Sequence, residues 1–140
     1  MSGDSFFYEF GNDDLIYLKD VKIFKTDESA PKLMNEDDWY DLDIITCAAP
    51  DFNYVINVNG YREIIYKRLE RILMVAAKEK VEVLILGAFG CGAFHNPPEI
   101  VASCFKILLN KYHFETVEFA VYSNNEDKFS NYNIFKNILG

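Results

Sequence analysis

The sequence predicts an α/β domain in which helices cover a mostly parallel sheet. Its 140 residues, half of them hydrophobic, are enough for one core and leave little room for a second. From residue 42 onward, short β-rich runs alternate with amphipathic helical patterns in the order β, α, β, α, β, α. Such alternation favours parallel strands joined by right-handed crossovers. We therefore expect one domain over residues 1–140, with short strands and an acidic loop over 1–41 and a βαβαβα core over 42–140.

The first part of the chain predicts extended structure followed by a loop. Over residues 5–26, short apolar and aromatic runs alternate with turn-forming pairs, which is typical of a hairpin or of two short extended pieces. Residues 27–41 are acidic and contain Pro31, which indicates a solvated loop. Residues 42–47 are rich in β-branched side chains and stop before Pro50, so we expect a buried strand that ends in a loop.

Three helices and two further strands account for the rest of the chain. Apolar residues recur at helical spacing over 61–80, with charged residues on the opposite face. Pro97 and Pro98 suit the first turn of a second helix, with Asn96 as its cap. The elements that complete the pattern are strands over 81–86 and 116–122 and a last amphipathic helix over 132–139.

Charge and cysteine usage exclude several classes of protein. The net charge of −8 and the pI near 4.7 argue against a broad basic surface, so we expect neither a nucleic-acid polymer nor a membrane as partner. Cys47, Cys91 and Cys104 form no CxxC pair and are odd in number, which indicates neither a disulfide framework nor a metal site. No cofactor is indicated either. The sequence shows no signal peptide and no apolar run long enough to span a bilayer, and we expect a cytoplasmic protein.

The segment most typical of a binding function is the glycine-rich loop GAFGCG, residues 87–92. Three glycines in six residues allow positive φ angles and let a ligand approach main-chain N–H groups closely. The helix that follows adds the partial positive charge and free N–H groups of its first turn, so a diphosphate could bind without a basic side chain. The loop lacks the Gly-Lys-Ser/Thr ending of a P-loop and the GxGxxG spacing of dinucleotide-binding folds. Its spacing alone leaves a phosphate site and a purely structural turn as alternatives.

A longer stretch around this loop resembles a known family. Residues 84–109, LILGAFGCGAFHNPPEIVASCFKILL, are similar to the C-terminal signature of the macrodomain-like branch of poly(ADP-ribose) glycohydrolases common in bacteria. IITCAAPDFN (44–53) and VEFAVYSN (117–124) also resemble segments of that family, and the similarity extends from about residue 8 to residue 139. The resemblance implies a three-layer α/β/α macrodomain-like fold with a mostly parallel mixed sheet, shortened at the N-terminus.

The resemblance also implies a ligand, ADP-ribose or a related nucleotide, and the residues around it. The glycine loop would wrap the diphosphate and adjoining ribose, the loop after Cys47 would lie near the ligand, and the end of the last strand would flank the nucleoside. The ligand-binding residues implied in this way are Gly87, Ala88, Phe89, Gly90, Cys91, Gly92, Ala93, Phe94, Pro50, Asn53, Tyr122 and Asn124. Asp51 and Ser123 lie beside them in the sequence. Either Phe89 or Phe94 would stack on the adenine or ribose.

The sequence departs from the family where catalysis is concerned. Hydrolysis in that family depends on a glycine triplet followed by a glutamine and two glutamates, whereas this sequence has neither a GGG triplet nor any glutamine. Cleavage of a glycosidic bond needs a carboxyl group that protonates the leaving oxygen or orients water. Glu99, Asp51 and His95 could act as substitute acids or bases and Cys91 as a nucleophile, but each has a simpler structural explanation. His95 could also donate a hydrogen bond to a phosphate. We expect no catalytic residue.

Three functions remain open. The first is a module that binds ADP-ribose without turning it over, as a sensor, carrier or sequestering protein. The second is the C-terminal part of a glycohydrolase whose catalytic glutamates come from a missing segment or a partner chain. The third is a degenerate structural or interaction domain. In each case an open sheet edge would favour a homo-oligomer or a complementary chain that covers it.

Overall fold

The computed structural model describes residues 14–54, 58–122 and 130–140, apart from the side chains of Tyr54, Val58 and Asn59. The chain divides into two compact units, and the boundary between them falls after Cys47. One unit comprises Asp14–Cys47 and the other contains the described residues from Ala48 to Gly140. Each unit contributes one pair of strands.

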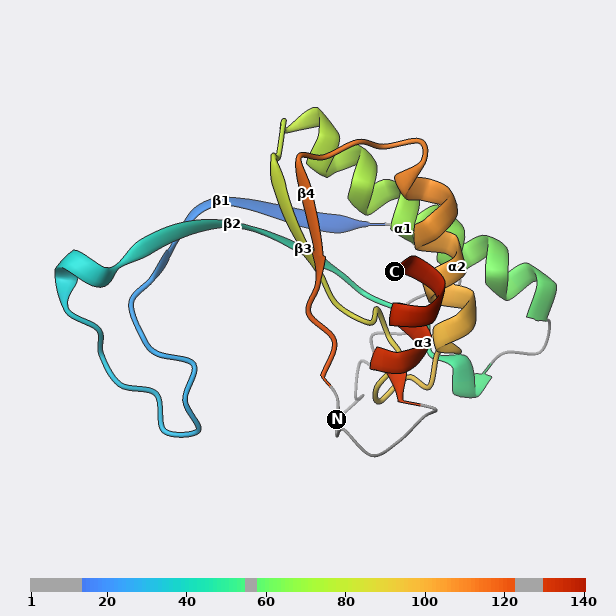
Figure 1. Cartoon of the computed structure of the whole chain (residues 1–140), viewed down its shortest axis with the longest axis horizontal. Helices are drawn as coiled ribbons and strands as arrows, with labels where there is room; N and C mark the ends of the chain where they lie inside the picture. The colour runs from blue at the N-terminus through green and yellow to red at the C-terminus, as the bar shows by residue number, and fades with distance from the viewer. Residues whose placement is uncertain (1–13, 55–57, 123–129) are drawn as a thin grey trace, which may run out of the picture. The chain divides into compact units, whose positions relative to one another are not determined.

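The smaller unit is an antiparallel ribbon. Strand β1 (Leu15–Ile23) pairs with β2 (Tyr40–Cys47), with Leu15 opposite Cys47 and Ile23 opposite Tyr40 (Figure 1). The register shifts between Leu18 and Val21, where Asp20 takes a φ of 53°. Asp43 fixes this irregularity, because its carboxylate accepts hydrogen bonds from the Tyr17 hydroxyl and the Asp20 N–H. The first of these bonds, followed by the second, lowers the pKa of Asp43.

The strand predicted over residues 42–47 is thus present. We predicted a mostly parallel mixed sheet, and in the described part of the chain β2 forms its ladder antiparallel to β1. The acidic segment between the two strands contains a short 3₁₀ helix, η1 (Glu36–Asp38). The extended pieces predicted over 5–26 resolve into the single strand β1 within the described residues, and 5–13 lie outside them.

The larger unit carries the alternating α/β pattern. In chain order it contains η2 (Phe52–Tyr54), α1 (Val58–Lys78), β3 (Val83–Leu86), α2 (Pro98–Leu109), β4 (Thr116–Phe119) and α3 (Asn131–Leu139). Strands β3 and β4 run side by side and pair in parallel, with Val83 opposite Thr116 (Figure 1). Helix α2 packs between α1 and α3.

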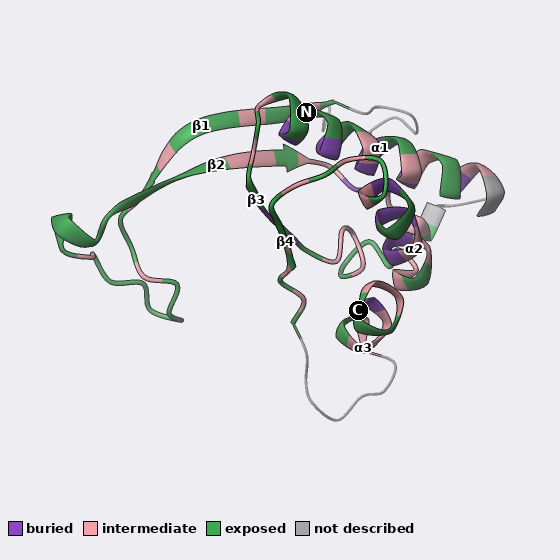
Figure 2. Cartoon of the chain, turned by 45° about the horizontal axis from the view of Figure 1, so that its top comes forward, coloured by how far each residue is buried: buried purple, intermediate pink, exposed green. Residues whose placement is uncertain are grey.

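The core of this unit lies between the helices and one face of the β3–β4 pair. Figure 2 shows the buried residues concentrated on α1 and α2. Phe119 of β4 lies edge-on to Phe105 of α2, with ring centroids 5.2 Å apart, and also packs against Phe135 of α3. Leu84 and Leu86 of β3 are buried on the same face. Helical and strand periodicity therefore agree with the packing that is observed.

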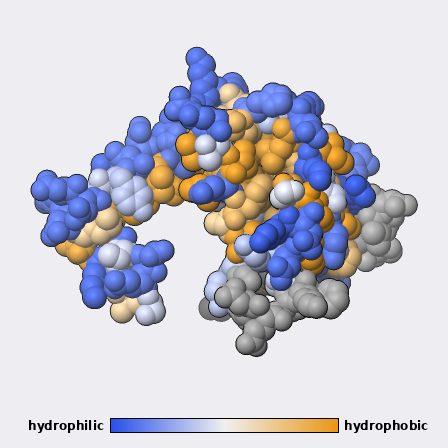
Figure 3. All heavy atoms as spheres, in the orientation of Figure 1, coloured by the Kyte–Doolittle hydropathy of each residue, from blue (hydrophilic) through white to orange (hydrophobic). Residues whose placement is uncertain are grey.

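The opposite face of β3 is exposed although it is apolar. Val83 is 57% and Ile85 60% exposed, and hydrophobic residues gather on the surface around this strand in Figure 3. A run that is apolar on both faces is typical of a central strand with neighbours on each edge and layers on each side. Among the described residues, no helix is long and apolar enough to cross a membrane.

Candidate functional site

Two loops of the larger unit meet at the end of β3. One is the glycine-rich loop that leaves β3, and the other is the segment 48–53 that leads into η2. They are joined by the backbone, because Phe52 N donates to Phe94 O at 2.9 Å. They are also joined by a side chain, because Asn96 Nδ2 donates to Pro50 O at 3.0 Å. The structure therefore brings the predicted residues Pro50 and Asn53 next to the predicted glycine loop.

Asn96 shapes the glycine loop from within. Its side chain is 1% exposed, and its Nδ2 also donates to Gly90 O at 2.8 Å. We predicted Asn96 as the N-cap of α2, and this was wrong: Pro97 occupies the cap position, and no side chain caps the helix. An Asn before two prolines suits an N-cap as well as a buried side chain that joins two loops, so the sequence pattern does not distinguish the two roles.

Backbone N–H groups of the loop fall into two sets. Four of them bond inside the protein, since Phe89, Cys91 and Asn96 donate to Gly87 O, Ala88 O and Gly90 O, and His95 donates to Gly92 O. In the described part of the chain the other N–H groups from residue 88 onward have no protein acceptor. These belong to Ala88, Gly90, Gly92, Ala93 and Phe94. A loop with several unpaired N–H groups can hold an oxygen anion.

The helix behind the loop contributes less than we predicted. Pro97 and Pro98 have no N–H, and both Ile100 N and Val101 N donate to Pro97 O. Within this first turn, the Glu99 N–H is the amide left without a protein acceptor. An anion would therefore be held mainly by the loop amides rather than by the end of α2.

A polar cluster spans the two loops at the surface. The Asp51 carboxylate Oδ1 accepts a hydrogen bond from Asn53 N at 3.0 Å and another from Asn53 Nδ2 at 2.7 Å. The same Nδ2 lies 3.3 Å from Nδ1 of His95. His95 has a φ of 52°, a left-handed conformation that is uncommon for a residue other than glycine. No feature of the sequence pattern predicts this contact between Asn53 and His95.

Buried anchors hold the segment 48–53 against α1. Arg68 is 1% exposed, and its Nη1 donates to Ala48 O at 2.7 Å. The Phe52 ring packs edge-on against the Tyr61 ring, with centroids 4.8 Å apart. Sequence reasoning missed Arg68 because its helical position offered no sign that a basic side chain would be buried.

The Cys91 thiol has a raised pKa. Burial, and next the Glu99 carboxylate, raise the pKa of Cys91 to about 12. Its Sγ contacts Phe89 O at 3.7 Å. Both features disfavour the alternative of a nucleophilic Cys91 and favour the interpretation of a small side chain tucked behind the loop. On its other side, Cys91 O accepts a hydrogen bond from Asn131 Nδ2 of α3 at 3.4 Å.

The aromatic candidates differ in exposure. Phe94 is 40% exposed, whereas Phe89 is half-buried and lines an apolar cavity of about 170 Å³ together with Ile72, Leu86 and Phe105. Tyr122, beyond β4, is 87% exposed. Asn124 and Ser123 lie outside the described residues. Among the described residues, no three His, Cys, Asp or Glu side chains come together in a way that could hold a metal ion.

This arrangement defines an α/β domain with an anion-binding type of loop at the carboxyl end of a parallel strand, the usual ligand position in such folds. No protein-family model matches the sequence, and no curated protein matches it. Solved structures do match. A mutant of poly(ADP-ribose) glycohydrolase from Deinococcus radiodurans, in complex with ADP-ribose, aligns with 34% identity and a TM-score of 0.80. The alignment covers 91% of this chain and 52% of that one.

A second bacterial enzyme gives the same result. A mutant of poly(ADP-ribose) glycohydrolase from Thermomonospora curvata aligns with 27% identity and a TM-score of 0.80, over 93% of this chain and 50% of that one. The same enzyme bound to the inhibitor ADP-HPD aligns with 28% identity and a TM-score of 0.78, over 91% of this chain and 49% of that one. The chain is therefore similar in sequence and structure to bacterial poly(ADP-ribose) glycohydrolases, and it spans about half of their length. The resemblance and the macrodomain-like α/β fold that we predicted are confirmed.

Proposed function

We propose that this chain binds ADP-ribose or a related adenine nucleotide through residues 87–94 and does not hydrolyse it. The proposal rests on loop N–H groups that have no acceptor among the described residues. These are the N–H groups of Ala88, Gly90, Gly92, Ala93 and Phe94. Such groups bind a diphosphate without basic side chains, which suits a chain of net charge −8. The relatives solved with ADP-ribose and with ADP-HPD support the same ligand class.

The proposal of binding without catalysis rests on the carboxylates. Near the loop, Asp51 already accepts two hydrogen bonds from Asn53. Glu99 lies at the start of α2, where a carboxylate complements the positive end of the helix. Each carboxylate thus has a structural explanation, and the sequence contains no glutamine and no glycine triplet. A sensor, a carrier or a sequestering protein would each use such a site.

Calorimetric titration with ADP-ribose, AMP and NAD tests the proposal. Gly92→Val is the matched variant, because no protein atom lies within 4 Å of a Cβ built at Gly92, so the fold is preserved while side-chain atoms cover the loop amides. We expect ADP-ribose to bind the natural chain and to bind this variant at least tenfold more weakly. Absence of heat with all three nucleotides would contradict binding by this chain alone. Release of free ADP-ribose from an ADP-ribosylated protein would contradict the non-catalytic role.

The alternative function is part of a glycohydrolase completed by another polypeptide. Two observations favour it: the chain spans about half of its relatives, and β3 exposes Val83 and Ile85 on an uncovered face. The test mixes the chain with a polypeptide that corresponds to the remaining half of the Deinococcus radiodurans enzyme. Hydrolysis that appears in the mixture and in neither component alone would establish this function. Light scattering on the chain alone then shows whether a second copy covers the face instead.

A further inference from the structure

The amide of Asn53 has a defined orientation. Its Nδ2 lies 2.7 Å from Oδ1 of Asp51, and the Asn53 main-chain N donates to the same oxygen at 3.0 Å. An ionised carboxylate only accepts hydrogen bonds, so the NH₂ end of the Asn53 amide faces Asp51. The reversed amide would place two acceptor oxygens against each other. Asp51 therefore fixes which end of Asn53 points towards His95.

That orientation determines where His95 carries its proton. Nδ2 of Asn53 lies 3.3 Å from Nδ1 of His95, and an NH₂ group can only donate. Nδ1 must therefore be the acceptor nitrogen, because two facing donors would repel. The ring of a neutral imidazole then holds its hydrogen on Nε2. The chain of contacts from Asp51 through Asn53 to His95 thus leaves one outward N–H donor on the imidazole.

The residue that carries this donor directly follows the loop amides of the proposed diphosphate site in the chain. His95 is exposed and follows directly after Gly92, Ala93 and Phe94, whose N–H groups have no acceptor among the described residues. Its left-handed conformation, with φ of 52°, is maintained by the bond from His95 N to Gly92 O at 2.9 Å. A non-glycine residue in this region is strained, and such strain persists where the surroundings define the conformation.

We propose that His95 is an additional phosphate-contacting residue and that Asn53 is its positioning residue. The inference rests on the proposed function. Asn53 holds the imidazole with Nε2–H outward, so that the ring donates to a phosphoryl oxygen of the nucleotide alongside the loop amides. The contact needs no formal positive charge. The sequence left a phosphate contact by His95 as one alternative and placed Asn53 itself near the ligand; the inference assigns Asn53 the role of orienting His95 instead.

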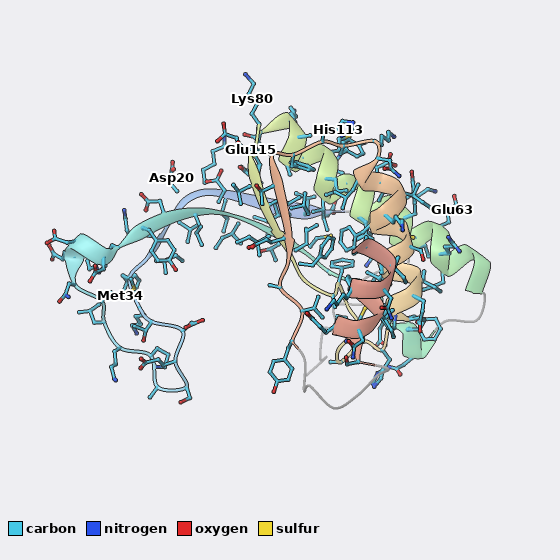
Figure 4. The ribbon with its side chains drawn as sticks, in the orientation of Figure 1. Asp20, Met34, Glu63, Lys80, His113 and Glu115 are labelled. Atoms are coloured by element: carbon cyan, nitrogen blue, oxygen red, sulfur yellow. The ribbon has the colours of Figure 1, made fainter. Side chains whose placement is uncertain are left out.

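The tautomer can be measured without a ligand. The sequence has two histidines, and His113 lies between α2 and β4, at the end of the strands away from the glycine loop (Figure 4). In ¹⁵N-labelled protein at about pH 8, where an imidazole is neutral, long-range ¹H–¹⁵N spectra distinguish the two ring nitrogens. His113→Gln assigns the signals. We expect the Nε2–H form for His95 in the natural chain and a mixture of tautomers in Asn53→Ala. A dominant Nδ1–H form, or no change in Asn53→Ala, would overturn the inference.

Ligand binding then separates a positioning role from a direct contact. His95→Gln keeps an N–H donor near the place of Nε2, whereas His95→Met has a similar size and no donor, with the same backbone strain. We expect His95→Met to weaken ADP-ribose binding about three- to tenfold and His95→Gln to restore most of it. Asn53→Ala should cost a similar factor in the natural background and nothing further in the His95→Met background. An equal loss in both backgrounds would show that Asn53 contacts the ligand itself and would overturn the inference.

Inorganic pyrophosphate separates failure of this inference from failure of the proposed function. If ADP-ribose does not bind but pyrophosphate shifts the Nε2 signal of His95, the phosphate contact is retained and the nucleotide function is lost. If ADP-ribose binds and leaves that signal unchanged, the inference is overturned and the proposed function stands. If neither compound shifts the signal and neither binds, both the inference and the proposed function are overturned.

Discussion

Asn96 and Gly90 are packed so closely that the second must be glycine. Asn96 Nδ2 donates to Gly90 O at 2.8 Å, and a Cβ built on Gly90 would lie 1.9 Å from that nitrogen. The same Cβ would lie 2.6 Å from the Cβ of Ala49, and the φ of Gly90 is 70°. The packing of Asn96 therefore requires glycine at the middle glycine position of the loop.

Gly90→Ala should be strongly destabilising for this reason. The added methyl group meets two buried groups and sits on a backbone of positive φ, so we expect a loss of about 2–5 kcal/mol in the free energy of unfolding. Urea unfolding followed by circular dichroism measures it. Gly92→Ala is the control, since nothing lies within 4 Å of its Cβ, and it should change stability by about 0.5 kcal/mol or less. Equal stability of the two variants would contradict the packing described here.

Asn96→Ala should destabilise the chain because two carbonyls lose a side-chain donor. Pro50 O loses its Asn96 donor in a buried region, and Gly90 O keeps only the bond from the main-chain N of residue 96. We expect a loss of about 2–4 kcal/mol in unfolding free energy, measured by urea titration. Asn110 provides a matched control, because its Nδ2 donates to Lys106 O at 3.1 Å on an exposed surface. Asn110→Ala should cost about 1 kcal/mol or less, and an equal cost at both positions would rule out a special role for Asn96.

Periodicity predicted the helices and strands because their patterns are local. The helix expected over 61–80 is α1, the two later strands are β3 and β4, and the last helix is α3 with Ser130 as its cap. The choice of partner for a strand depends on residues that are distant in the sequence. Residues 42–47 have the composition of a buried strand whichever neighbour they take, so the antiparallel pairing with β1 could not be read from them.

The candidate site was predicted as a list of residues but not as an arrangement. The glycine loop was recognisable because three glycines in six residues indicate positive φ angles or a close approach of another group to the backbone. The role of Asn96 depends on Pro50, 46 residues away, and that of Asn53 on His95, 42 residues away. A single sequence carries no signal for such contacts between polar side chains. The weaker contribution of α2 could have been foreseen, since its two prolines lack N–H groups.

Tyr61→Phe should stabilise the chain. The Tyr61 hydroxyl is buried, and within the described residues it has no hydrogen-bond partner. Removing it relieves an unsatisfied polar group and keeps the ring contact with Phe52, so we expect a gain of about 1 kcal/mol in unfolding free energy. Thermal unfolding at neutral pH provides the measurement. Tyr112→Phe, which loses the 3.4 Å contact with Glu70, should bring no gain. A loss of 1 kcal/mol in Tyr61→Phe would reveal a partner for the hydroxyl.

Cys91 makes stability depend on pH in the alkaline range. The pKa of its thiol rises from the ordinary 9.0 to about 12 in the folded state, so the folded chain holds this proton more tightly than the unfolded chain does. Stability is therefore unaffected by this group below about pH 9 and falls as pH rises from there towards 12. Burial raises the pKa of Tyr61 and of Cys104 in the same direction, so the comparison is made in a Tyr61→Phe background in which Cys104 is kept throughout. Cys91→Ala should make the decline less steep and Cys47→Ala should preserve it. The same slope in both would exclude Cys91 as its source.

Phe94 is the aromatic residue that we expect to stack on the base. It is 40% exposed at the end of the glycine loop, and its carbonyl is held by Phe52 N, whereas Phe89 lines the cavity against Leu86 and Phe105. Stacking between a base and an aromatic ring contributes about 1–3 kcal/mol, so Phe94→Ala should weaken ADP-ribose binding about 5- to 150-fold in calorimetric titration.

Inorganic pyrophosphate is the control ligand for Phe94, because it has no base. Its affinity should be the same for the natural chain and for Phe94→Ala, since the loop amides that would hold it belong to the backbone. Phe94→Trp, which keeps a stacking surface, should retain ADP-ribose binding within about threefold. If Phe94→Ala weakened pyrophosphate and ADP-ribose by the same factor, the side chain would be supporting the loop rather than the adenine. The base would then have to stack elsewhere, and Tyr122, 87% exposed beyond β4, would be the next residue to substitute.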